Sequence, residues 1–179
     1  IQYKNAFYGT TISGGNPSGG GVGTIFKVTP AGSETVLHIF TGQPDGADSH
    51  AALIAYNANF YGMTEEGGSK GLGTVFKMTP KGKLTIIHNF TNSQGEGYHP
   101  FGATLLNVNG TFYGSLSSTY VGSGGIFQIT PSGSESLAYV FGDNIAGVYS
   151  DVIDVGGLLY GTTINGGPAE QGTVYAVPL

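Results

Sequence analysis

The polar residues whose types suit ligand binding gather in loops, and the densest group is Asp45-Gly-Ala-Asp48 followed by His50. Carboxylate oxygens are the ligands that Ca²⁺ prefers, although this spacing lacks the later bidentate glutamate of an EF-hand loop. Asp-Gly is also a common turn sequence. Two interpretations stay open: a ligand-binding loop with Ca²⁺ as the candidate cofactor, and an ordinary turn. The sequence assigns no other cofactor and no definite metal ligand.

Two tyrosines indicate a different chemistry. Tyr98 and Tyr120 fall in segments rich in Gly, Ser and Asn, where an aromatic ring beside polar groups can stack on a sugar. Ordinary packing within the loop is the alternative. Together with the acids of the same loops, the candidate ligand-binding residues are Asp45, Asp48, His50, Glu96, Tyr98, Tyr120 and Asp143.

Catalytic motifs are nearly absent. Gly67-Gly-Ser69-Lys-Gly71 matches the G-x-S-x-G pattern, but that motif requires a strand-to-helix turn, and no helical periodicity follows it. Glu65 and Glu66 are the acids that a hydrolase would use, yet adjacent side chains on an extended segment point to opposite sides. We therefore predict that the chain is not an enzyme and assign no catalytic residue; a hydrolase is the alternative.

The elements that must position these residues repeat along the chain. An aromatic-Tyr-Gly triplet, with leucine first in the last copy, is followed by a β-rich run that ends in Thr-Pro or Pro, and then by a run that ends in Phe. The triplets are Phe7-Tyr8-Gly9, Phe60-Tyr61-Gly62, Phe112-Tyr113-Gly114 and Leu159-Tyr160-Gly161. A fourth apolar run precedes each of the later triplets, at 51–56, 103–108 and 150–155. Each copy thus reads as four short strands. Strand A is the run before the triplet, strand B contains the triplet, strand C is the run that ends in Thr-Pro or Pro, and strand D is the run that ends in Phe.

Several of these strands are apolar at consecutive positions, which suits a sheet covered on both faces. A repeat of about 50 residues with four strands is typical of a β-propeller blade. We predict an all-β fold: a single-domain propeller over 1–179, with blades at approximately 1–42, 43–92, 93–142 and 143–179. The last blade is incomplete because its D strand is missing. The favoured arrangement is a ring closed within one chain, and a larger ring completed by another copy is the alternative.

The histidines follow the repeat only in part. His38 and His88 occupy the same place in their D strands, where the third copy has Tyr139. A position that accepts tyrosine is expected to be packed and hydrogen-bonded rather than metal-binding. His50 and His99 lie at non-equivalent places in D-to-A loops, and no partner is predicted for either.

The residues 159–163 (Leu-Tyr-Gly-Thr-Thr), and Phe60-Tyr-Gly followed by Gly73-Thr-Val-Phe-Lys-Met-Thr-Pro80, resemble the GloVer-type tandem repeats of bacterial extracellular and surface-anchored proteins. The strand order is also loosely similar to NHL-type blades. The resemblance covers the whole chain. It implies an exported β-rich repeat protein located outside the cell or at its surface, and it brings no established catalytic residue.

The long B-to-C and D-to-A loops are expected to share one face, because the connections of an antiparallel meander alternate between its two ends. That face would hold seven acids (Asp45, Asp48, Glu65, Glu66, Glu96, Asp143 and Glu170) against Lys70. Solubilising loop charge is one interpretation. The other is an acidic surface that binds Ca²⁺ or docks on the opposite face of a neighbouring copy, which would give head-to-tail stacks.

The chain of 179 residues has no arginine, no cysteine and a net charge of −5, so we expect no nucleic-acid partner. No apolar run is long enough to predict membrane insertion. The predicted function is a structural module that self-associates into oligomers or filaments. A carbohydrate-binding propeller that uses the long-loop face is the alternative.

Overall fold

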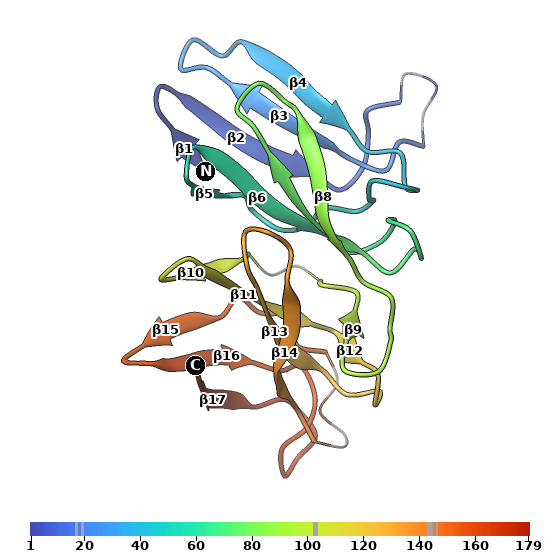
Figure 1. Ribbon diagram of the computed structural model, residues 1–179, viewed down its shortest axis with the longest axis vertical. Coiled ribbons are helices and arrows are strands. Elements are labelled where there is room, and N and C mark those ends of the chain that lie inside the picture. The colour runs from blue at the N-terminus through green and yellow to red at the C-terminus, as the bar shows by residue number, and fades with distance from the viewer. Residues whose placement is uncertain (17, 19, 102–103, 143–144, 146) are drawn as a thin grey trace.

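The computed structural model describes residues 1–16, 18, 20–101, 104–142, 145 and 147–179, and it places one antiparallel sheet in each repeat (Figure 1). We call these sheets blades 1 to 4. Blade 1 contains β1 (Gln2–Tyr3), β2 (Ala6–Thr11), β3 (Thr24–Val28) and β4 (Glu34–Ile39). Blade 2 contains β5 (Ile54–Tyr56), β6 (Asn59–Thr64), β7 (Thr74–Met78) and β8 (Leu84–Asn89). Blade 3 contains β10 (Leu106–Val108), β11 (Thr111–Leu116), β13 (Gly125–Ile129) and β14 (Glu135–Val140). Blade 4 contains β15 (Ile153–Val155), β16 (Leu158–Thr162) and β17 (Val174–Pro178).

The all-β prediction is confirmed, since the described residues form strands and turns without a helix. It follows that no helix among them is long and apolar enough to cross a membrane. In blades 1 to 3 the pairing of the last two strands shifts register at the same place, between Ile25 and Phe26 and at the corresponding residues of the next two blades. The repeat in the sequence is thus a repeat in register as well.

The glycine of the aromatic-Tyr-Gly triplet is required by close packing within each blade. A Cβ built on Gly9, Gly62 or Gly114 would lie 2.5–2.7 Å from the aromatic ring of the facing C strand, Phe26, Phe76 or Phe127. In blade 4 a Cβ on Gly161 would lie 2.2 Å from the Tyr175 hydroxyl oxygen. The far end of the C-strand ring therefore lies over a stretch of the neighbouring strand that has no side chain.

Aromatic side chains also join one blade to the next. The Phe60 ring lies 4.4 Å from the Tyr8 ring across the first interface, and Phe112 lies 4.7 Å from Tyr61 across the second. The three core clusters of the described residues correspond to the interfaces between blades 1 and 2, 2 and 3, and 3 and 4. We call the side of a blade that carries the triplet tyrosine its forward face, and the side that carries the first residue of the triplet its back face. At each interface the forward face of one blade packs on the back face of the next.

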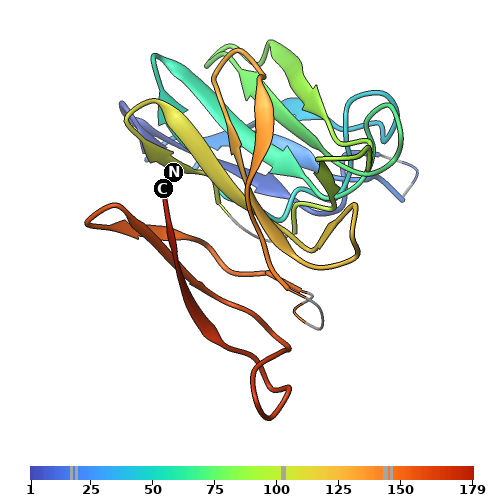
Figure 2. The ribbon, with the colours of Figure 1, turned by 60° about the horizontal axis from the view of Figure 1, so that its bottom comes forward.

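A closed four-blade ring is not confirmed. The blades follow one another along the long axis, with blades 1 and 4 at opposite ends of the molecule (Figure 1). Blade 4 stands apart from blades 1 and 2 in the second view as well (Figure 2). No core cluster of the described residues joins the first and last blades. What is established is an all-β, propeller-like succession of sheets; the favoured closure within one chain finds no support in these contacts.

The long loops meet at one end of the blades and pair with one another. Ala47 of a D-to-A loop exchanges backbone hydrogen bonds with Glu66 of a B-to-C loop. In the next repeat the same two loop types form a small sheet of β9 (Gly97–Tyr98) and β12 (Ser118–Thr119). This end, which we call the loop face, has its loops held in place by backbone hydrogen bonds.

The packing of the triplet glycine leads to a stability prediction. Gly62→Ala is expected to lower the free energy of unfolding by roughly 1–3 kcal/mol, because the new methyl group would collide with the Phe76 ring and the Leu53 side chain. Gly142→Ala is the control: Gly142 has no neighbour within 4 Å of the added Cβ, so its effect should stay within about 0.5 kcal/mol. Urea unfolding followed by circular dichroism measures both, and equal effects would contradict this account of the motif.

Candidate functional site

Three histidine–carboxylate pairs lie at the loop face. His38 Nε2 lies 2.7 Å from Asp45 Oδ2, His50 Nε2 lies 3.2 Å from Glu65 Oε2, and His88 Nε2 lies 2.9 Å from Glu96 Oε1. All six side chains are largely buried, with exposed fractions between 13% and 29%. The first and third pairs are equivalent in the repeat, whereas the second joins two different loops.

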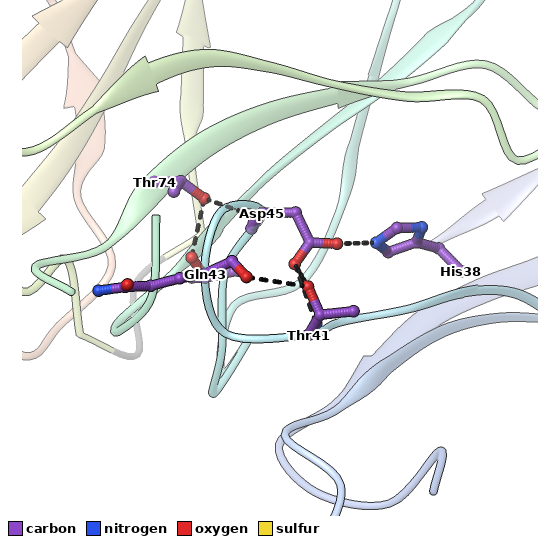
Figure 3. Close-up of polar contacts among 6 residues, drawn as sticks. His38, Thr41, Gln43, Asp45 and Thr74 are labelled. Atoms are coloured by element: carbon purple, nitrogen blue, oxygen red, sulfur yellow. Dashed lines mark hydrogen bonds and ion pairs between the residues drawn. The ribbon is translucent and has the colours of Figure 1, made fainter. Parts of the chain in front are cut away.

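The Asp45 carboxylate is a structural anchor for its loop (Figure 3). Its Oδ2 forms a hydrogen bond with His38 Nε2, and its Oδ1 accepts hydrogen bonds from the Thr41 backbone N–H and the Thr41 hydroxyl. Both oxygens thus have partners within the protein. The expectation of a packed, hydrogen-bonded role for His38 agrees with this contact.

The Asp45-Gly-Ala-Asp48 and His50 group does not converge on one point. Asp45 is directed at His38, while His50 is directed at Glu65. Asp48 lies between them with a positive φ of 54°, and its backbone N–H and C=O bond to Val22 and Glu65. Among the described residues, the group that could hold a metal ion lies elsewhere. The Ca²⁺ hypothesis for this loop therefore has no geometric support.

The most chemically varied cluster surrounds Glu65, which follows β6. His50 approaches the Glu65 carboxylate, and His99 Nδ1 lies 3.1 Å from the Glu65 backbone oxygen. The His50 ring packs on Phe101, with centroids 4.7 Å apart, and Phe101 packs on Tyr149 at 4.6 Å. We call these five residues the Glu65 cluster. It combines a carboxylate, two imidazoles and an aromatic ledge, which are groups that can bind a polar ligand and exchange protons.

Burial raises the pKa of Glu65 above its ordinary value, and the neighbouring His50 and His99 partly oppose that rise. Glu66 and Asp48 act in the same direction as burial. A carboxyl group with a raised pKa beside an imidazole is the kind of pair that serves in proton transfer. Glu65 and Glu66 are adjacent, and their side chains were expected to point to opposite sides. The partner of Glu65 is instead His50, which comes from another loop.

The two predicted tyrosines do not form a platform. Tyr98 is only partly exposed: it lies in β9 against the core cluster between blades 2 and 3, with its ring 5.2 Å from His99. Tyr120 is 44% exposed, and its backbone N–H donates to the Glu96 carbonyl. Glu96 is held in its own loop beside His88. Asp143 lies outside the described residues.

Comparisons with known proteins agree with the repeat. The family model described as the Gloeobacter/Verrucomicrobia repeat matches residues 1–177. The chain belongs to this family. The resemblance to GloVer-type repeats is thereby confirmed. Among curated proteins no significant match is found.

A solved structure of luciferin-regenerating enzyme is similar to this Gloeobacter/Verrucomicrobia repeat protein, with a TM-score of 0.59 and 15% sequence identity. The match covers 98% of the present chain and 58% of the other, so this chain spans less than two thirds of that protein. The prediction that the chain is not an enzyme is corrected by this finding, because the similar structure belongs to an enzyme. At such identity the likeness concerns the fold alone.

The environment of Glu65 gives a pKa prediction for this family member. His50→Gln should raise the pKa of Glu65 further, because the substitution removes the positive charge that partly opposes the effect of burial. His38→Gln is the matched control, since His38 contacts Asp45 and not Glu65. An NMR titration that follows the Glu65 carboxyl carbon measures both variants. A fall in the pKa of Glu65, or equal shifts in the two variants, would contradict the proposed environment.

Proposed function

We propose that this chain is a self-assembling module in which the forward face of blade 4 in one copy packs on the back face of blade 1 in the next. The observation that carries the proposal is the exposure of residues whose equivalents are buried in the other blades. The proposed occupant of each end face is a second copy of this chain. Location outside the cell or at its surface remains part of this proposal.

The forward face of blade 4 is apolar and uncovered. Val174 is 78% exposed, whereas the residues at the same place in blades 1, 2 and 3 (Ile25, Val75 and Ile126) are fully buried. Ile153 is 57% exposed on the same face. These two side chains and Tyr160 border a hollow of about 260 Å³. A contiguous apolar surface of this kind commonly marks an interaction site.

The back face of blade 1 is its counterpart. Phe7 is 48% exposed, whereas the equivalent residues Phe60, Phe112 and Leu159 are fully buried. Phe26 and Val28 on the same face are only partly buried. Each of the four triplets begins with an apolar residue. In the described structure, Phe7 is the only one of these four residues that has no tyrosine to pack against.

The internal interfaces provide the template for the contact. Phe60 packs between Tyr3 and Tyr8, with ring centroids 5.2 and 4.4 Å away. By the same register, Phe7 of one copy would pack on Tyr160 of another, beside Val155 at the place of Tyr3. This contact joins two different surfaces, so it is heterologous and forms rings or filaments according to its rotation. Two copies would supply about eight blades, which is within the usual range for propellers.

This proposal predicts an oligomer that is sensitive to both end faces. In sedimentation equilibrium the unmodified chain should have at least twice its monomer mass of 18.3 kDa. Phe7→Asp and Val174→Asp should each be monomeric at the same concentration, because each places a charge in the apolar contact. An equimolar mixture of the two variants should regain dimer, since one intact pair of faces remains.

Val121→Asp is the matched control, because Val121 is 56% exposed in the loop after β12 and belongs to neither end face. It should assemble like the unmodified chain. A monomeric unmodified chain at about 100 μM would overturn the proposal, and so would variants that assemble unchanged. A dimer formed by only one of the two variants on its own would overturn it as well, because it would indicate a symmetric contact between two copies of a single end face.

A second candidate function is carbohydrate binding at the loop face, favoured by the aromatic ledge of the Glu65 cluster. Tyr149 is 38% exposed and its ring packs on Phe101. The Glu65 carboxylate and the His50 imidazole lie beside this ledge. Exposed rings next to polar groups suit a sugar, whose faces are apolar and whose edge is hydroxylated.

The sugar hypothesis predicts a hit on a glycan array that depends on this ledge. Tyr149→Ala should weaken binding by roughly two- to tenfold, since an aromatic contact contributes about 0.5–1.5 kcal/mol. Tyr120→Ala is the control, because Tyr120 is similarly exposed but contacts another loop. An array without hits, or equal losses in both variants, would remove this candidate.

A further inference from the structure

The interface between blades 2 and 3 contains a third charged group beside the His88–Glu96 pair. Glu135, the first residue of β14, offers a carboxylate oxygen that lies within 4.8 Å of the ligand atoms of His88 and Glu96. The three residues come from a D strand, a D-to-A loop and the next blade. They therefore meet only in the folded chain, and they lie outside the Glu65 cluster and both end faces.

The Glu96 carboxylate is held with one oxygen directed at the other two residues. Its Oε2 accepts hydrogen bonds from the Thr91 backbone N–H at 3.1 Å and from the Thr91 hydroxyl, with a longer one from the Ser93 N–H at 3.4 Å. Its Oε1 faces His88 Nε2 at 2.9 Å, a distance suited to an ion pair. The loop thus fixes the carboxylate independently of His88.

Two polar atoms of the group are buried without a hydrogen-bond partner among the described residues: His88 Nε2, which is near Glu96 but not aligned with it as a hydrogen bond, and Glu135 Oε1. Leaving buried polar atoms unpaired is costly. Burial and the Glu96 carboxylate together raise the pKa of Glu135 to about 7. No ion pair among the described residues brings a lysine to these two carboxylates.

The interface between blades 1 and 2 has an equivalent histidine–carboxylate pair, and there the pair has a structural role alone. There His38 and Asp45 form an aligned hydrogen bond of 2.7 Å, and Asp45 has its remaining oxygen paired. The position of Glu135 is occupied by Leu84, which packs against the core between blades 1 and 2. The second interface has therefore replaced an apolar contact with a carboxylate aimed at a histidine and another carboxylate.

We infer that His88, Glu96 and Glu135 form a binding site for a divalent transition-metal ion, with Zn²⁺ as the proposed ion. One imidazole nitrogen and two carboxylate oxygens are a ligand set that zinc accepts in proteins. Ca²⁺ and Mg²⁺ prefer oxygen ligands alone. Three protein ligands leave a fourth position for water or a ligand. Because the ligands come from two blades, the ion would also fasten blade 2 to blade 3.

The test uses the complete chain without an affinity tag, after treatment with EDTA. At a zinc concentration about 100-fold above the dissociation constant, the melting temperature should rise by roughly 5–10 °C. Co²⁺ in place of zinc should give the visible absorption of a tetrahedral site. Isothermal titration calorimetry should give one Zn²⁺ per chain.

The repeats themselves provide the variants. Glu135→Leu introduces the residue that blade 2 has at this position, Leu84. His88→Tyr introduces the residue that blade 3 has at the equivalent position, Tyr139. Both variants should therefore fold. Each should lose most of the zinc-dependent rise and the Co²⁺ spectrum. Glu34→Leu, the same position on the exposed back face of blade 1, should retain both. Absence of a zinc effect in the unmodified chain would overturn the inference, as would an undiminished effect in Glu135→Leu.

Discussion

The structure depends on the contact between an aromatic ring and a backbone without a side chain. In every blade the ring of the C strand lies across the triplet glycine of the B strand, with no room for a methyl group. Beside this contact, the first residue of the triplet packs on the tyrosine of the preceding blade, as Phe60 does on Tyr8 and Phe112 on Tyr61. Four such sheets can then pack in series, and the loops at one end are brought close enough to pair.

The D strand illustrates how one structural position takes different roles. His38 forms a hydrogen bond with a loop aspartate and closes the loop, whereas Tyr139 occupies the place in blade 3. His88 keeps the position but faces a longer carboxylate, and the next blade contributes Glu135 in place of an apolar residue. A glutamate that lies one residue farther along the loop, together with a carboxylate from the next blade, thus turns a closed hydrogen-bonded pair into a group with unpaired ligand atoms.

The sequence was sufficient for features that recur and insufficient for contacts between non-equivalent loops. The triplets located the B strands, and the Thr-Pro runs located the C strands, because both patterns reflect packing that every blade shares. The A strands are shorter than the apolar runs suggested: β5 begins at Ile54 rather than Ala51. The His50–Glu65 contact was missed because its two residues belong to different loop types and have no counterpart in the other repeats. Tyr98 was taken for a loop residue because the two-residue strand β9 has no alternating pattern.

The exposed end faces follow from the same repetition that stabilises the interior. An internal blade covers one neighbour with its tyrosine face and is covered by the other on its phenylalanine face, so each interface joins unlike surfaces. Two forward faces brought together would set Tyr160 against a second Tyr160, and two back faces would leave the Phe7 side chains without the tyrosines that receive Phe60 and Phe112. A symmetric dimer therefore cannot reproduce the internal packing. Only a head-to-tail contact would extend it: each added copy would bury one forward face and one back face, and would leave one face of each kind exposed at the two ends.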